Sequence, residues 1–372
     1  MKFKVNRKEL YQAIQNIIGA VPTKTTLPIL SNILFSLQEN KLTLTGTDLE
    51  VSISTNLEVQ EAENGTVAVP AKVLFEIMRE LPDIPVQFNC DDEFKIAIET
   101  EKGFYKLSGE PKDEFPQISI KDTDNYFEMN SDKLGRMIEK TLFAVSTDEL
   151  RTALMGVLLR VSENEMRMVA TDGHRMVRII DTNFTWSNAA NSTIIPTKAL
   201  NLLGKNLPLN TLITINLGED HIVFNFNETV IFCKSLEGQF PNYERVIPIE
   251  NDKKMIINRD LFISSVKRVS IFSNSITHQI RLSVRPSYLE ILSEDVEFGG
   301  EAREKIDIQY DGEDIDIGYN AAYLLDILRH LNSDDVEMNL KDPVSAGVLY
   351  PVEKETGEDI LMLLMPIRLN DD

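Results

Sequence analysis

The 372-residue chain has little of what most catalytic and metal sites are built from: two cysteines, one tryptophan and four histidines. No two histidines have the H-E-x-x-H spacing of a zinc protease, and no G-x-x-x-x-G-K-[ST] sequence marks a phosphate-binding loop. We therefore expect no bound metal, no nucleotide site and no cofactor.

Long apolar runs are also missing. The longest, LMLLMPI from Leu361, is far shorter than the roughly 20 residues that a membrane-spanning helix requires. The N-terminal segment MKFKVNRKEL lacks the apolar core of a signal peptide. Cys90 and Cys233 lie in strand-like segments and are expected to be buried free thiols in a reducing compartment. These features predict a cytoplasmic location with no membrane contact.

What the sequence does contain is a threefold repeat. The segments KVNRKEL, EMNSDKL and IINRDLF each place an asparagine before a helical apolar pattern, at Asn6, Asn130 and Asn258. These asparagines are 124 and 128 residues apart, and repeats of that length are whole domains rather than solenoid units. The predicted domains are 1–124, 125–250 and 251–372.

Further segments keep this spacing between the first two copies. TGTDLE matches ATDGHR, VPAKVLFEI matches IPTKALNLL, and GEPKDEFPQI matches LEGQFPNYERV. The paired residues Asp48 and Asp172 differ by 124 positions, and Pro116 and Pro241 by 125. The third copy is more diverged.

Each copy combines two helices with many short strands. Leu10, Ile14 and Ile17 form one helical face, and Asn6 is a candidate N-cap, with Glu9 placed as in a capping box. Alternating segments such as KLTLTGTD predict antiparallel strands, and the fold class is therefore α+β. The six predicted helices are 7–19, 71–81, 131–144, 197–207, 259–271 and 320–331.

Charge is unevenly distributed along the chain. The net charge is −21, but the six predicted helices hold thirteen basic and seven acidic residues, a balance of +6 that leaves −27 elsewhere. If the helices share one surface, that surface attracts phosphates without reading bases. The alternative is that Lys and Arg are simply good helix formers, although Glu is nearly as good and is depleted here.

Helix dimensions limit how such a surface can enclose DNA. Six helices side by side at about 10 Å spacing leave roughly 9 Å clear, and twelve leave roughly 28 Å. A DNA duplex is roughly 20 Å across. One chain therefore cannot encircle a duplex in this arrangement, whereas two chains can.

Five segments, in this order on this repeat, resemble the bacterial DNA sliding clamps, the β subunits of DNA polymerase III holoenzyme. They are TLPILSNILF, LTLTGTDLE, VATDGHRM, FPNYERVIP and MPIRL. The resemblance covers the whole chain. It implies three tandem clamp domains in a head-to-tail dimeric ring, with helices lining the inside and antiparallel sheets outside.

The resemblance also implies a function without catalysis. Clamps encircle duplex DNA, slide on it without sequence specificity, and tether polymerases and repair proteins through a peptide-binding groove. With no nucleotide site in the sequence, loading onto DNA is expected to need an ATP-driven clamp loader.

Position by position, the resemblance carries over a partner-peptide groove between the second and third domains. Its expected residues are Leu154, Thr171, Gly173, His174, Arg175, Met176, Pro241, Arg245, Val246, Asn320, Tyr323, Val344, Leu363, Met365, Pro366, Ile367 and Arg368. Ala346 stands where some members have Ser, and Asn370, Asp371 and Asp372 extend the chain beyond Leu369. Both departures bear on peptide selectivity.

For DNA, Lys24, Arg151 and Lys198 match basic family positions, and the helix cations add Lys72, Arg79, Lys133, Arg136, Lys140, Lys205, Lys267 and Arg268. The dimer seam is expected to join Tyr105 and Leu107 to Ile271 and Phe272. Around that seam, Lys102 and Lys106 are expected to face Glu297, Glu301 and Glu304.

Two other functions remain open. A scaffold of three clamp-like domains would bind proteins without encircling DNA. An enzyme would rest only on Asp172 and His174 in TDGHR, which we interpret instead as a strand-end turn at the rim of the groove.

Overall fold

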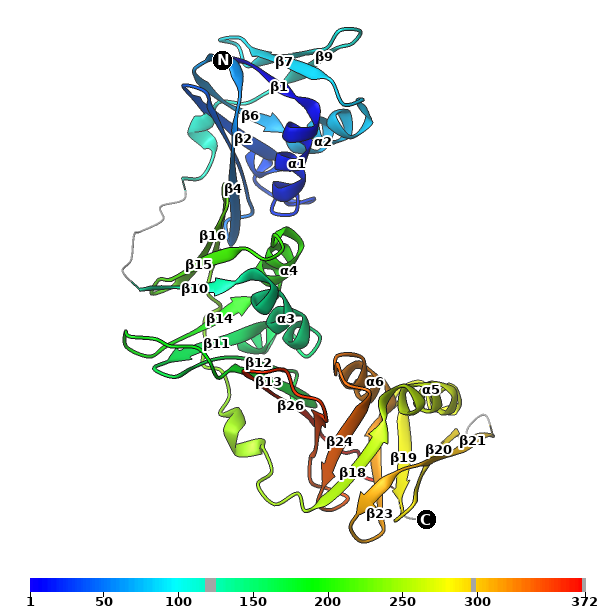
Figure 1. The fold of residues 1–372 in the computed structure, drawn as a ribbon. Coiled ribbons are helices and arrows are strands. Elements are labelled where there is room, and N and C mark those ends of the chain that lie inside the picture. Colours follow the sequence, from blue (N-terminus) through cyan, green and yellow to red (C-terminus); the bar gives the residue numbers. More distant parts are fainter. Residues whose placement is uncertain (118–124, 296–298, 370–372) are drawn as a thin grey trace. The chain divides into compact units, whose positions relative to one another are not determined.

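A computed structural model describes residues 1–117, 125–295 and 299–369 (Figure 1). All six predicted helices are confirmed, each ending within about three residues of its expected position. They are α1 (Arg7–Ile17), α2 (Ala71–Glu80), α3 (Ser131–Leu142), α4 (Thr197–Asn206), α5 (Arg259–Val269) and α6 (Ala321–Arg329).

Asparagine caps begin four of these helices, because an Asn side chain can accept a hydrogen bond from a free N–H of the first turn. The Asn6 side chain accepts from Lys8 N, that of Asn130 from Asp132 N, and that of Asn258 from Leu261 N. The Asn320 side chain accepts from the N–H groups of Ala322 and Tyr323. The repeated asparagine is therefore explained by helix initiation.

The chain folds into two compact units. The first contains Met1–Gly135 and Lys198–Ser235, and the second contains Arg136–Thr197 and Leu236–Asp372. The division runs through the predicted central domain, because some of its strands extend a sheet of the first domain and the others extend a sheet of the third.

The first unit contains a five-stranded and an eight-stranded sheet, with all neighbours antiparallel. The smaller sheet, in spatial order, is β5 (Gln60–Glu63), β1 (Lys2–Asn6), β7 (Pro85–Cys90), β8 (Lys95–Glu99) and β9 (Phe104–Ser108). The larger is β10 (Tyr126–Asn130), β15 (Leu212–Leu217), β16 (His221–Phe226), β17 (Thr229–Lys234), β4 (Val51–Glu58), β3 (Lys41–Thr47), β2 (Asn32–Gln38) and β6 (Gly65–Pro70).

The second unit contains a nine-stranded and a four-stranded sheet. The larger, in spatial order, is β14 (Asn191–Pro196), β11 (Gly156–Ser162), β12 (Glu165–Thr171), β13 (Arg175–Asp181), β26 (Glu358–Leu364), β25 (Gly347–Pro351), β24 (Asp335–Leu340), β18 (Lys253–Asn258) and β22 (Gln309–Asp311). The smaller is β21 (Gly300–Asp307), β20 (Tyr288–Asp295), β19 (Gln279–Val284) and β23 (Ile315–Asn320).

The core of the N-terminal domain lies between its two sheets and its helices. Phe3, Phe35 and Phe88 are fully buried, and the ring centroids of Phe3 and Phe88 are 4.8 Å apart. Leu10, Ile14 and Ile17 of α1 are also fully buried, as the apolar spacing in the sequence predicted. Cys233 is buried and Cys90 is half-buried, and both are free thiols.

Each long sheet joins strands of two domains, and we call the strand pair at which they meet a joint. The first joint is the pair β4–β17, the second is the pair β13–β26, and the two have the same register. At the first, Ser52 and Ser54 on β4 lie opposite Phe232 and Val230 on β17. At the second, Met176 and Arg178 on β13 lie opposite Leu363 and Leu361 on β26. Ser52 and Met176 are 124 residues apart, as are Ser54 and Arg178, and the sequence repeat is therefore also a repeat of strand pairing.

Candidate peptide-binding and DNA-contact sites

The second joint carries a cluster of apolar side chains, which we call the apolar cluster. Its buried members come from β11, β12, β13, β14, β25, β26, the short 3-10 helix Tyr243–Val246 and one loop. They are Leu158, Val169, Met176, Ile194, Tyr243, Ala346, Val348, Leu361 and Leu363. Residues of β11 and β26 are buried in runs rather than alternately, because both faces of these strands are covered.

The segment 240–247 packs against the apolar cluster and is fastened to it by Arg167. The Arg167 Nη1 donates to the Tyr243 hydroxyl at 2.9 Å and to the Glu244 carboxylate at 2.7 Å. Burial alone would lower the pKa of Arg167, but its hydrogen bonds to Tyr243 and Glu165 raise that pKa above the ordinary value. The guanidinium therefore stays charged and holds the segment in place.

Apolar side chains at the edge of the apolar cluster are exposed. Val246 is 53% exposed and Met365 is 39% exposed, whereas Leu154 is nearly buried. The Met365 N–H donates to the His174 carbonyl at 2.8 Å, which places the end of β26 beside the TDGHR turn. Exposed apolar groups next to a packed apolar cluster are typical of a surface that binds a partner.

TDGHR forms a strand-end turn, as the sequence analysis favoured. Oδ1 of Asp172 accepts from the N–H groups of His174 and Arg175, both at 2.9 Å. The Thr171 hydroxyl accepts from the Gly173 N–H, and Gly173 has φ +92°, a left-handed conformation that suits glycine. Asp172 is thus occupied by the turn and by an ion pair with Arg175, and it is not placed as a catalytic base.

Arg175 links the turn to α6. Its guanidinium lies 4.7 Å from the ring centroid of Tyr323 and 5.3 Å from that of Phe143. It also pairs with Asp326 at 2.6 Å, and the His174 and Tyr323 ring centroids are 5.8 Å apart. The structure therefore brings Tyr323 against the adjacent residues His174 and Arg175, although Tyr323 is far from them in the sequence.

The other expected groove residues lie around the start of α6 and the end of the chain. The side chain of Asn320 caps α6 and donates to the Thr277 carbonyl at 3.0 Å. The Ile367 N–H donates to the Gly318 carbonyl at 2.8 Å, and this contact places Pro366 and Arg368 beside β23. Val344 and Arg368 both line a polar pocket of about 710 Å³ in the C-terminal domain.

Several members of the apolar cluster were not predicted as site residues. Leu158, Val169, Val348 and Leu361 resemble ordinary core residues in the sequence, because a strand buried on both faces shows no alternation. One available signal was the run VLL in β11, where two adjacent strand residues cannot both face the same core. Pro241 and Arg245, by contrast, are exposed in the segment that carries Tyr243.

Most of the predicted DNA-contact cations are exposed, namely Lys24, Lys72, Arg79, Arg151, Lys198, Lys205, Lys267 and Arg268. Among the described residues, Lys24, Lys72, Lys205 and Lys267 form no ion pair. Arg151 pairs with Asp148, Lys198 with Asp48 and Arg268 with Glu304. The hydrogen bond from Arg268 lowers the pKa of Glu304, and the Glu304 carboxylate therefore stays ionised.

Two cations of α3 are engaged inside the second unit, and Lys133 is half-buried. Lys140 is only 5% exposed and donates to the His330 carbonyl at 2.5 Å, and burial lowers the pKa of its ammonium group. Arg136 is half-buried and pairs with Glu358 at 2.6 Å. A buried ammonium group cannot reach a phosphate without rearrangement, and Lys140 therefore supports the packing of α3 against the C-terminal domain.

Two of the strands that end a sheet lie at the expected dimer seam, and each has a neighbour on one side only in the described chain. In the first unit this is β9, which carries Tyr105 and Leu107, and in the second it is β21. Ile271 and Phe272 lie next to β21 and are 76% and 43% exposed. Glu301 and Glu304 lie on β21, whereas Glu297 and the tail 370–372 are outside the described residues.

Among the described residues, no group of His, Cys, Asp or Glu side chains could hold a metal ion. Each helix in residues 1–117, 125–295 and 299–369 is too short or too polar to span a bilayer.

Comparison with family models divides the chain into three consecutive matches. Residues 1–119 match the N-terminal domain of the DNA polymerase III beta subunit, 128–242 its central domain and 244–368 its C-terminal domain. The chain belongs to the bacterial beta sliding clamp family. It is therefore a non-catalytic processivity factor of DNA replication, with polymerase and DNA as its partners.

Similarity to individual sliding clamps extends over their full lengths. The beta sliding clamp of Pseudomonas putida is 33% identical over 371 residues, which cover 99% of this chain and 100% of that protein. The crystal structure of the Pseudomonas aeruginosa sliding clamp superposes with a TM-score of 0.93 at 32% identity, covering 99% and 100% of the two chains. The Bacillus subtilis clamp structure gives 0.94 at 26% identity, covering 99% of each chain.

Proposed function

We propose that two copies of this chain close head to tail into a ring around duplex DNA. The observation that carries this proposal is that two edge strands, β9 in one unit and β21 in the other, have large exposed apolar side chains on or beside them. Edge strands with exposed backbone groups favour pairing with another chain, and a head-to-tail interface can close into a ring. Domains 1–124, 125–250 and 251–372 are the proposed units of that ring, which would act in the cytoplasm.

Side-chain chemistry at the two edges supports the same pairing. β9 carries Lys106 beside the exposed Phe104, and β21 carries Glu301 and Glu304 beside Ile271 and Phe272. Aromatic and aliphatic groups supply the buried area, and charges of opposite sign favour one orientation. Exposed ion pairs contribute only about 0–1 kcal/mol each to stability, so we assign them to orientation.

The oligomeric state tests the seam directly. Replacing Ile271 and Phe272 by Ala should produce monomers in multi-angle light scattering, because both side chains are exposed in the single chain. Leu209→Ala and Leu212→Ala remove similarly exposed leucines on the loop and strand after α4, and this control should remain dimeric. An intact dimer after the first double substitution would place the seam elsewhere.

Topological retention distinguishes a sliding ring from a protein-binding scaffold. The protein is loaded onto nicked circular DNA by a clamp loader whose function with a related clamp has been established, and the complex is washed with high salt. We expect retention after the wash and release when the circle is cut, since encirclement does not depend on ionic contacts. Loss during the wash would indicate ordinary electrostatic binding and would favour the scaffold.

We further propose that the apolar cluster, with the exposed side chains of Val246 and Met365, binds short linear motifs of polymerases, the clamp loader and repair proteins. A preformed apolar surface with a few polar groups nearby is typical of peptide recognition. His174, Arg175 and Tyr323 would supply the polar and aromatic rim. The test is fluorescence anisotropy with a labelled peptide that carries a leucine anchor.

Met365→Ser is the informative substitution for that test, because Met365 is exposed and its loss should not unfold the strand. Removing one apolar contact of this size should weaken binding about tenfold or more. Val352→Ser changes an apolar residue of similar exposure, 43%, outside the apolar cluster and serves as the matched control. Unchanged affinity of Met365→Ser would show that the peptide binds elsewhere.

A further inference from the structure

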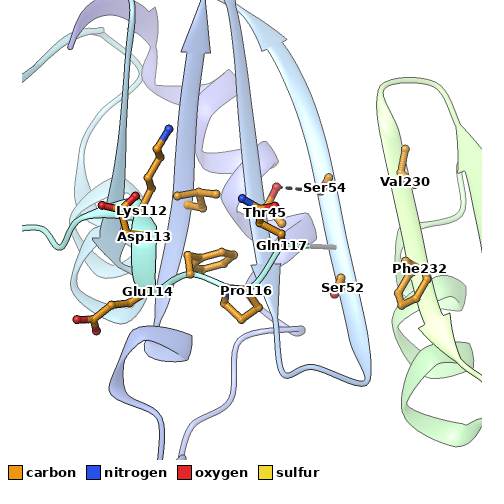
Figure 2. Close-up of a pocket in the computed structure, with 12 residues that line it drawn as sticks. Thr45, Ser52, Ser54, Lys112, Asp113, Glu114, Pro116, Gln117, Val230 and Phe232 are labelled. Atoms are coloured by element: carbon orange, nitrogen blue, oxygen red, sulfur yellow. Dashed lines mark hydrogen bonds between the residues drawn. The ribbon is translucent and has the colours of Figure 1, made fainter. Parts of the chain in front are cut away.

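The first joint has a pocket at the position that corresponds to the apolar cluster. It has a volume of about 740 Å³ and lies within the first unit, on the face of the eight-stranded sheet. Figure 2 shows residues 112–117 crossing the strands that carry Thr45, Ser52 and Ser54, with Val230 and Phe232 on β17. We refer to this feature as the first-joint pocket.

The strand register matches each residue of the first joint to a residue of the second. Leu34 pairs with Thr45 as Leu158 pairs with Val169. Ser52 lies opposite Phe232 as Met176 lies opposite Leu363. Pro116 precedes the linker after the first domain as Pro241 does after the second. The two joints therefore present the same backbone surface with different side chains.

The floor of the first-joint pocket is made of hydroxyl groups. Oγ1 of Thr45 and Oγ of Ser54 are 2.9 Å apart, and those of Thr47 and Ser52 are 2.6 Å apart. Thr47 also donates to the Val51 carbonyl, so that both O–H groups of the Thr47–Ser52 pair have acceptors. The Thr45–Ser54 pair uses one O–H for its mutual bond, and among the described residues the other has no acceptor.

The walls of the pocket are apolar and partly aromatic. Phe115 is buried, while Leu34, Pro116, Val230 and Phe232 are half-buried. Rings of this kind pack favourably against another aromatic ring. The rim carries exposed Lys112, Asp113 and Glu114, which gives it a net charge of −1 and disfavours an acidic ligand.

We propose that the first-joint pocket is a second peptide-docking site, which accepts an extended partner segment anchored by a tyrosine. The tyrosine ring packs against Phe232 and Pro116, and its phenolic oxygen accepts the free O–H of the Thr45–Ser54 pair. An aliphatic anchor would cover that O–H without supplying an acceptor, at a cost in affinity. The pocket volume of about 740 Å³ lies within the range of roughly 300–1,000 Å³ that is typical of ligand pockets, and it can therefore hold a tyrosine side chain and its neighbours in the peptide.

This proposal rests on the proposed peptide-tethering function. It assumes only that the face of a joint can bind a peptide, and it does not depend on binding at the apolar cluster. The probes are three fluorescein-labelled octapeptides of Gly and Ser with a single central Tyr, Phe or Leu. Titrations use the full-length protein and its Met365→Ser variant. We expect the Tyr peptide to bind both proteins equally and about fivefold more tightly than the Phe peptide, as one neutral hydrogen bond predicts.

The double variant Thr45→Val/Ser54→Ala tests the hydroxyl pair because it nearly keeps the shape of both side chains and removes both hydroxyl groups. It should bind Tyr and Phe peptides equally. Ser36→Ala on β2 removes a half-buried hydroxyl of the same sheet that does not line the pocket, and it should keep the preference for Tyr. Circular dichroism checks that both variants fold. Hydrogen exchange should show protection on β3 and β4 when the Tyr peptide is bound.

Each result has a distinct meaning. A Tyr peptide that fails to bind, or that loses binding with Met365→Ser, overturns the second site. A preference for Tyr that survives the Thr45→Val/Ser54→Ala double substitution overturns the role of the hydroxyl pair. If the Leu peptide binds equally well to Met365→Ser, the proposed site at the apolar cluster is wrong, whereas the result for the Tyr peptide still stands.

Discussion

The two joints of this chain share one backbone arrangement but present different side chains. At the first, Thr45, Ser52 and Ser54 form a floor of hydroxyl groups on the outer strand faces. At the second, the matching positions hold Val169, Met176 and Arg178. Strand register, sheet order and the following proline segment are common to both. The comparison shows that the repeat determines where a surface forms, while a few outward-facing side chains determine what that surface can bind.

The largest difference should appear at the matching positions Leu363 and Phe232. Leu363 is 2% exposed and belongs to the apolar cluster, whereas Phe232 is half-buried at the wall of a pocket. Leu363→Ala should lower the free energy of unfolding by about 2–5 kcal/mol through lost contacts and a cavity. Phe232→Ala should cost only about 1 kcal/mol.

Urea unfolding measures both changes. The single tryptophan, Trp186, is buried in the second unit and reports on Leu363→Ala by fluorescence, while circular dichroism follows Phe232→Ala. Equal losses would mean that the first-joint pocket is as tightly packed as the apolar cluster, and the contrast between the joints would fail.

A second difference concerns Arg175, whose counterpart at the first joint is the buried apolar residue Val51. Arg175→Met should lower the free energy of unfolding by about 2 kcal/mol, because Asp172 and Asp326 lose the charge that pairs with them. Arg175→Lys keeps the charge but not the flat stacking between Phe143 and Tyr323, and it should lose less.

The same urea titration, followed by Trp186 fluorescence, distinguishes these variants. If Met and Lys were equally destabilising, stacking rather than charge would hold the TDGHR turn against α6. If neither substitution changed stability, the contacts of Arg175 would not stabilise the second joint. The two joints would then differ only in the side chains of the proposed peptide-binding surface.

The sequence predicted the helices well, because an apolar face and an N-cap are local signals. Leu10, Ile14 and Asn6 illustrate this, since all three are placed as expected. The joints could not be predicted in this way. Pairing of β4 with β17 connects residues more than 170 positions apart, and no local pattern records which strand edge meets which.

The candidate site was predicted in part for a similar reason. His174, Arg175 and Tyr323 were expected at the groove from resemblance, and the structure brings them together. Asn320 was also expected at the groove from resemblance, but its role as the cap of α6 was not predicted. Lys140 was interpreted as a DNA contact from its residue type on a predicted helix, and its side chain instead bonds the His330 carbonyl, a neighbour that the sequence does not identify.

The two strand-end turns differ in the residue that adopts a left-handed backbone, and substitutions there should change stability in opposite directions. Asp48 accepts from Glu50 N and Val51 N just as Asp172 accepts from His174 N and Arg175 N. The next residue is left-handed in both turns, with φ +92° at Gly173 and +81° at Leu49. Left-handed backbone costs a residue with a Cβ atom about 1–2 kcal/mol.

Gly173→Ala should therefore destabilise the protein by about 1–2 kcal/mol, whereas Leu49→Gly should stabilise it by at most about 1 kcal/mol. The gain is smaller because glycine also increases the entropy of the unfolded chain. Thermal unfolding of the two single variants measures both signs. A stabilising Gly173→Ala would show that the TDGHR turn relaxes out of the left-handed conformation.

The smallest expected effect concerns Asp48 and Asp172, whose carboxylates have different ion-pair partners. Asp172 pairs with the half-buried Arg175, but Asp48 pairs with Lys198, which is more exposed and is a proposed DNA contact. Asp48→Asn keeps the acceptor for the turn and releases Lys198, and an exposed pair of this kind contributes only about 0–1 kcal/mol to stability. Stability should therefore hardly change.

DNA binding should change more clearly than stability. A released lysine can neutralise one more phosphate, which steepens the dependence of log K on log salt concentration by about 0.9. Anisotropy titrations of a short duplex at several salt concentrations measure that slope. Asp148→Asn releases Arg151 in the same way and should act alike. If both slopes stayed unchanged, Lys198 and Arg151 would serve their turns rather than DNA, and the positive surface would have to rest on Lys24, Lys72, Lys205 and Lys267.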